Sequence, residues 1–172
     1  MKSCRRSLRC RALKMYDIDI LRNSMKYSFY GSDTAADVKA VRHIYRGIET
    51  PLDLYDALSK IWCRDTCAPR MRSSWTTENP TLGQCSITAF LAQDIFGGEV
   101  YGLTAKSGDL HCYNVVDGHT FDLTSEQFKE AAKDLVYTGN PLQDRESGAH
   151  FFKEEKRRRY EYLKSRLAEE CS

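Results

Sequence analysis

A cysteine in the middle of the chain has the surroundings of a nucleophile. Cys85 lies in "TLGQCSITAFLAQDIFGG" (residues 81–98), where a strongly apolar helix is predicted to begin. The unpaired N–H groups of a helix's first turn favour negative charge, and they lower the pKa of a thiol placed there. The alternative interpretation is an inert buried thiol, because free cysteine is among the most buried residue types.

A predicted hairpin supplies a histidine and a carboxylate. In "HCYNVVDGHTFDLT" (111–124), Asp-Gly separates two runs of β-branched and aromatic residues. This is the pattern of a two-residue type I′ turn, in which the residues that flank Asp-Gly pair with each other. Strand side chains alternate between faces, so this register places His111 and Asp122 on one face as diagonal neighbours within hydrogen-bonding reach. Asn114 falls on the opposite face.

Nucleophile, base and orienting carboxylate are the ingredients of covalent thiol catalysis. We therefore expect a cysteine-dependent hydrolase or acyl transferase that acts on an amide, ester or thioester. Cys85 would attack the acyl carbon, His111 would take the thiol proton, and Asp122 would fix the imidazole. The backbone N–H of Cys85 is one predicted oxyanion donor. The further oxyanion and orienting candidates are Gln84, Asn79, Trp75 and Asn114.

Two other classes of function fit the same residues. One is a catalytically inactive binding module for a peptide or small ligand, and the other is a metal-binding protein that uses Cys85, His111 and nearby thiols. Cys63 and Cys67 in "CRDTC" have a spacing that zinc permits, but a second pair is missing. The seven cysteines are odd in number and no export signal is visible, which predicts free thiols in a reducing cytoplasm. No cofactor is expected.

Length and composition predict one domain over residues 1–172. No apolar run approaches the roughly 20 residues of a membrane span, and a net charge of +2 favours no particular partner. The basic residues of segment 1–30, and "KRRR" at 156–159 beside several glutamates, are interpreted as solvated charge rather than a nucleic-acid site. The expected partner is a small-molecule or peptide substrate, without nucleic acid or membrane; the oligomeric state is not predicted.

The fold class predicted from periodicity is α+β. A buried helix that starts near Cys85 packs on a three-stranded antiparallel meander, and further helices flank it. Thr50 and Pro51 indicate a helix start, and pairs of Thr and Gln three residues apart predict capping boxes at Thr81 and Thr124. The loop 63–80 is predicted to be ordered. The predicted helices cover 34–45, 51–62, the part of 81–98 from near Cys85 to Gly97, 124–137 and 151–170, the last within a C-terminal segment 145–172. The predicted strands cover 99–106, 111–117 and 120–124.

These motifs resemble known cysteine enzymes. "GQC", "HCYN" and "FDLT" are similar to the transglutaminase-like branch of the papain-like enzymes, which implies that Cys85, His111 and Asp122 form a triad on a papain-like core. The chain departs from transglutaminases at Ser86, where they have tryptophan, and it is much shorter than their calcium-dependent members. The stretch 61–128, the expected catalytic core, resembles the YunG-like family of small bacterial proteins. That resemblance implies a fold and a triad, without a defined substrate.

Overall fold

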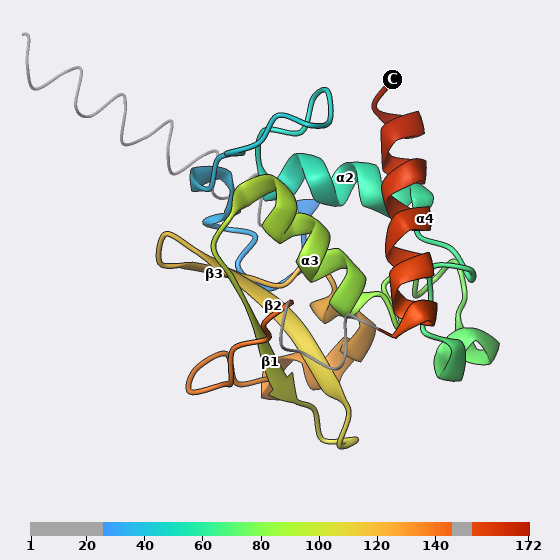
Figure 1. The fold of residues 1–172 in the computed structure, drawn as a ribbon. Coiled ribbons are helices and arrows are strands. Elements are labelled where there is room, and N and C mark those ends of the chain that lie inside the picture. The colour runs from blue at the N-terminus through green and yellow to red at the C-terminus, as the bar shows by residue number, and fades with distance from the viewer. Residues whose placement is uncertain (1–25, 146–152) are drawn as a thin grey trace, which may run out of the picture.

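The structure is a computed structural model that describes residues 26–145 and 153–172. It has an α+β architecture in which helices surround one small antiparallel sheet (Figure 1). Most of the predicted basic segment 1–30 lies outside the described residues. Along the chain the elements are η1 (Ala35–Asp37), α2 (Pro51–Ile61), η2 (Pro69–Ser74), α3 (Cys85–Phe96), β1 (Glu99–Thr104), β2 (Leu110–Val116), β3 (His119–Phe121), η3 (Ser125–Asp134) and α4 (Glu154–Glu170).

The sheet has the order β1-β2-β3 and the register predicted from the Asp-Gly turn. Val116 pairs with His119, and both turn residues, Asp117 and Gly118, have positive φ values of 48° and 83°. Two central residues with positive φ define the type I′ turn, whose twist matches that of the strands. The prediction of this hairpin is confirmed, and it fixes which side chains of β2 share a face.

Helix α3 packs on β2 and carries Cys85 as its first residue. Its apolar side chains are buried in the main core, and it ends where Gly97 takes a positive φ of 74°. The capping box predicted from Thr81 is wrong. Gln84 is itself the N-cap residue without a side-chain cap bond, because its amide donates instead to the carbonyl oxygen of Cys63.

Two predicted helices are absent or distorted. Over 34–45 only the three residues of η1 are helical, because the N–H groups of Val41 and Arg42 bond to the carbonyl of Ile95 at the end of α3. Over 124–137 the chain forms η3, a 3-10 helix interrupted at Lys129, where φ is 52°. The capping box predicted at Thr124 is also wrong, since that hydroxyl bonds to Asp122.

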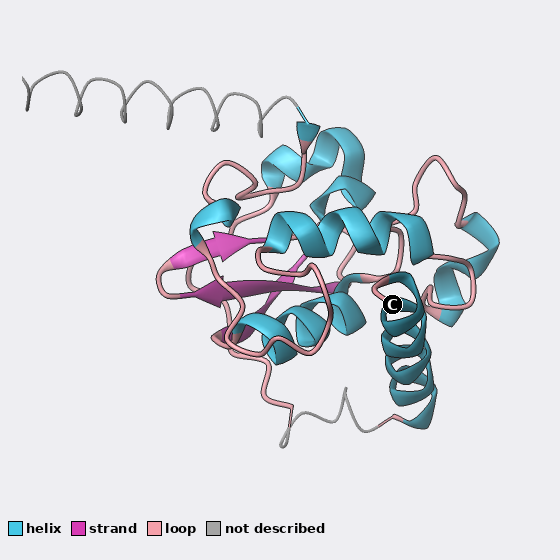
Figure 2. Ribbon diagram, turned by 90° about the horizontal axis from the view of Figure 1, so that it is seen from above, coloured by secondary structure: helices cyan, strands magenta, loops and turns pink. Residues whose placement is uncertain are grey.

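The last helix, α4, packs against α2 and α3 and stands beside the sheet rather than over it (Figures 1 and 2). Tyr160, Leu163 and Leu167 are buried in the core, as predicted. Arg159 is only 5% exposed, so the interpretation of 156–159 as a solvated face is wrong for this residue. Phe152, predicted to point inward, lies outside the described residues. No helix within 26–145 or 153–172 is long and apolar enough to cross a membrane.

Candidate functional site

The packing of α3 on β2 brings Cys85 against His111. The His111 imidazole and the backbone N–H of Cys112 lie close enough to the Cys85 thiol for hydrogen bonding to both to lower its pKa. A thiolate gains from both contacts, and the first turn of α3 adds the positive end of a helix dipole. The two residues are 26 positions apart in sequence, and they meet because one begins the helix and the other lies on the strand beneath it.

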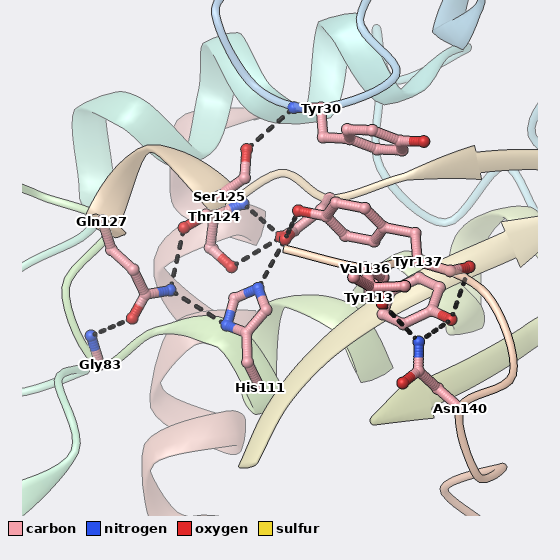
Figure 3. A network of polar contacts seen from close by, with 11 residues as sticks. Tyr30, Gly83, His111, Tyr113, Thr124, Ser125, Gln127, Val136, Tyr137 and Asn140 are labelled. Atoms are coloured by element: carbon pink, nitrogen blue, oxygen red, sulfur yellow. Dashed lines mark hydrogen bonds and ion pairs between the residues drawn. The ribbon is translucent and has the colours of Figure 1, made fainter. Parts of the chain in front are cut away.

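A carboxylate holds the other side of the imidazole (Figure 3). His111 Nε2 lies 2.5 Å from Asp122 Oδ2, and both side chains are almost fully buried. Asp122 Oδ2 also accepts a hydrogen bond from the Tyr137 hydroxyl at 2.8 Å, while Oδ1 accepts from the backbone N–H and hydroxyl of Thr124. Since Asp122 occupies Nε2, Nδ1 is the nitrogen left to exchange a proton with the thiol.

The two partners shift each other's pKa values in opposite directions. Burial disfavours ionisation of the Cys85 thiol, but the hydrogen bond and charge of His111 lower its pKa below the ordinary value. Burial likewise disfavours the imidazolium, yet the charge and hydrogen bond of Asp122, with those of Cys85, raise the pKa of His111 to about 10. The site therefore favours a thiolate–imidazolium pair backed by a carboxylate.

Cys85 and His111 open onto a cavity of about 760 Å³. Ser86 and Phe90 of α3 line it beside the thiol, and Ala68 with the first residues of η2 (69–71) forms another side. The N-terminal half of α4 closes it with a group of charged side chains. A cavity of this volume, lined by both apolar and charged side chains, has the size of a small-ligand site.

The other predicted site residues have their amide or indole hydrogens engaged away from the thiol. Trp75 Nε1 donates to Pro80 O, and Asn79 Nδ2 donates to Gln127 O. The Gln84 amide bonds to Cys63 O, and Asn114 bonds to Ala89 O on the opposite face of β2. None of the four lines the cavity. The oxyanion donors that remain are the backbone N–H groups of Cys85 and its neighbour, because α3 has no side-chain cap.

Gln127 belongs to the site, although its sequence pattern indicated only a helix cap. Its Oε1 accepts from the backbone N–H of Gly83 at 3.3 Å, and its Nε2 donates to Thr124 O at 2.9 Å. The same Nε2 lies 3.4 Å from His111 Nδ1 (Figure 3). Gln127 thus links the loop before Cys85, the imidazole and the turn after Asp122. No local pattern signals these contacts.

Lys156 and Arg159 of α4 also line the cavity. Arg159 donates to the carbonyl oxygens of Thr66 and Gly83, and so ties α4 to the loops before the nucleophile. A sequence signal for both did exist. They stand at helical spacing before Leu163, and therefore on the buried stripe of the same helix.

The metal-binding alternative finds no ready set of ligands in the part of the chain that the structure describes. Within residues 26–145 and 153–172, no three His, Cys, Asp or Glu side chains converge on one point. Cys63 and Cys67 are free thiols there, and the Thr66 hydroxyl contacts the sulfur of Cys63 at 3.8 Å.

Comparison with known proteins agrees with the resemblance to the YunG-like family. Residues 50–172 match the family model described as YunG protein. The uncharacterized protein YunG of Bacillus subtilis (strain 168) is 40% identical over 72 residues, which span 42% of this chain and 57% of the relative. The match therefore covers little more than half of that relative's length. No solved structure matches the chain.

Proposed function

The chain belongs to the YunG family, and we propose that it is a cysteine-dependent hydrolase or acyl transferase built on a papain-like, transglutaminase-like core. One observation carries the proposal. His111 is held between the buried carboxylate of Asp122, 2.5 Å from Nε2, and the thiol of Cys85 at the first residue of α3. This order of groups matches nucleophile, base and orienting carboxylate in thiol catalysis.

Acylation begins with the sulfur of Cys85. Its thiolate attacks the carbonyl carbon of an amide, ester or thioester bound in the cavity, and the thiol proton resides on His111 Nδ1. The carbonyl electrons move onto oxygen, and the N–H groups of Cys85 and Ser86 stabilise this oxyanion. The bond to the leaving group then breaks, and His111 gives its proton to the departing amine, alcohol or thiol.

Deacylation reverses these roles. His111, neutral after the first step, takes a proton from water or from an acceptor amine, alcohol or thiol that attacks the thioester. Collapse of the second tetrahedral intermediate returns the electron pair to sulfur and releases an acid or a transferred acyl product. Water as the attacking group makes the protein a hydrolase, and another acceptor makes it an acyl transferase.

The proposed setting is the reducing cytoplasm, with a small-molecule or peptide substrate. Support for it comes from the thiols, since Cys63, Cys67, Cys85, Cys112 and Cys171 are all free. Reactive thiols persist as thiols where glutathione and thioredoxin keep them reduced.

The test is alkylation of the protein with iodoacetamide between pH 4 and 10, with the modified residue identified by mass spectrometry. Cys85 should react well below pH 8.5, the ordinary thiol pKa. Cys85→Ala should remove this reaction, and it should also remove any acyl adduct formed from a panel of activated esters. His111→Ala should return the Cys85 profile to that of a simple thiol.

His43→Ala is the matched control, because that imidazole is exposed and distant in sequence from the site. It should leave the alkylation profile unchanged. A Cys85 that titrates near pH 8.5 and forms no adduct with any ester would refute the proposed enzymatic function. The alternative of a catalytically inactive binding module would then remain. Stoichiometric zinc in the purified protein, bound through Cys85, would support the metal-binding alternative instead.

A further inference from the structure

The side of the cavity formed by α4 has more basic than acidic side chains. Four basic side chains line the cavity: Arg70, Lys153, Lys156 and Arg159. Two of them have carboxylate partners, because Arg70 pairs with Asp109 at 3.1 Å and Arg159 pairs with Glu155 at 2.9 Å. The third acidic residue on the cavity surface, Asp144, has interactions of its own.

Lys156 is the remaining cation that is partly buried, whereas Lys153 is exposed to solvent. The ion pairs of the described residues include no carboxylate partner for Lys156. Burial lowers its pKa, and the charges of the Cys112 and Cys85 thiols act in the opposite direction. A partly buried ammonium group without a carboxylate partner is costly, and an anion bound beside it would offset part of that cost.

From this arrangement we propose that Lys156 is a specificity-determining residue that binds a carboxylate of the substrate while Cys85 attacks its acyl group. The inference rests on the proposed function and adds the class of substrate, an acyl compound with a free carboxylate.

A carboxylate fits better than a phosphate. A phosphate group carries up to two charges and is typically held by several donors, often from an arginine fork. Arg159 gives its NH1 donors to the backbone carbonyls of Thr66 and Gly83, and Arg70 is paired with Asp109. Beside the exposed Lys153, one partly buried ammonium group, that of Lys156, therefore remains for one negative charge.

The experiment compares two alkylating reagents of nearly the same size. Iodoacetate carries the carboxylate, and iodoacetamide is its neutral counterpart; both lose iodide when the Cys85 thiolate attacks their methylene carbon. The measured quantity is the second-order rate constant of iodoacetate at Cys85 divided by that of iodoacetamide, both at pH 7. This ratio is then divided by the same ratio for glutathione. In the unchanged protein this normalised ratio should exceed one.

Lys156→Gln should lower the ratio about tenfold, the effect expected for one charge at several ångströms in a partly buried site. Lys156→Arg should keep most of it. Arg157→Gln is the matched control, because it removes one positive charge from the exposed face of the same helix and should leave the ratio unchanged. Circular dichroism would confirm that each variant is folded.

Equal ratios in Lys156→Gln and Arg157→Gln would overturn the assignment of Lys156. Failure of the proposed function is seen separately, as a slow iodoacetamide reaction that follows an ordinary thiol pKa. Sodium acetate should protect Cys85 from iodoacetate in the unchanged protein and lose this effect in Lys156→Gln. Stronger protection by inorganic phosphate than by acetate would overturn the choice of a carboxylate.

Discussion

Replacement of Asp122 by Asn tests the electrostatic linkage at the centre of the site. The substitution keeps the size of the side chain and an acceptor for Thr124, and removes a charge 2.5 Å from His111 Nε2. Asp122 and Cys85 together raise the pKa of His111 from 6.5 to about 10 against the effect of burial. One pKa unit corresponds to about 1.36 kcal/mol, so this shift favours the imidazolium by on the order of 5 kcal/mol.

Without the carboxylate, burial disfavours the imidazolium and the His111 pKa should fall below 6.5. The asparagine amide also donates to Nε2, so the imidazole proton moves to Nδ1, where it cannot accept the proton of Cys85. In Ser-His-Asp hydrolases this change of tautomer costs about 10⁴ in kcat. The Cys85 thiol should then titrate at or above pH 8.5.

The assay is the rate of iodoacetamide alkylation at Cys85 as a function of pH. At pH 6 the rate in Asp122→Asn should fall roughly a hundredfold or more, because only a small fraction of an ordinary thiol is ionised there. Asp117→Asn makes the same chemical change in the exposed hairpin turn and should alter nothing. An Asp122→Asn profile that overlays the unchanged protein would refute the electrostatic argument.

Three further predictions concern stability, measured as the free energy of unfolding in urea. In the unchanged protein, the raised His111 pKa stabilises the fold below pH 6.5, and this stabilisation is lost as the pH rises towards 10. The lowered Cys85 pKa makes the free energy of unfolding rise with pH instead, so the two effects offset each other. Cys85→Ala should therefore reveal a decline of up to about 1.4 kcal/mol per pH unit above 6.5, and a level curve in that variant would contradict the assignment. Gln127→Leu leaves the N–H of Gly83 without its acceptor and should cost about 1–3 kcal/mol; a loss below about 0.5 would show that this bond is dispensable. Gly98→Ala should cost about 2–4 kcal/mol, because φ is +68° and the new Cβ would lie 2.3 Å from a backbone oxygen; an unchanged midpoint would mean that the turn relaxes.

The parts of the fold that local chemistry decides could be predicted from the sequence. Asp117 and Gly118 specify one type of turn, and alternation along β2 then brings His111 to the same face as Asp122. The start of α2 follows the same logic, since Thr50 is the N-cap and Pro51 the first helical residue, as predicted, and Asp53 completes a capping box with Thr50. These features depend on residues within a few positions of each other.

The features that sequence reasoning missed depend on distant partners. The segment after η1 has helical periodicity, yet its N–H groups bond to the carbonyl of Ile95, more than 50 residues away. Gln127 follows Thr124 at capping distance, but its acceptor oxygen is used by Gly83, 44 residues earlier. Periodicity identifies which residues can form a helix, and it cannot show that a bond from another part of the chain replaces one inside that helix.

The position of α4 along the chain has a consequence for synthesis. Cys85, His111 and Asp122 all leave the ribosome before α4, the last element that the structure describes. The Arg159 bonds that hold the loops before the nucleophile, and the side of the cavity that carries Lys156, therefore form only when α4 docks on α2 and α3. Until then the nascent chain has Cys85 without a complete cavity, so the proposed binding of substrate requires that this helix has folded.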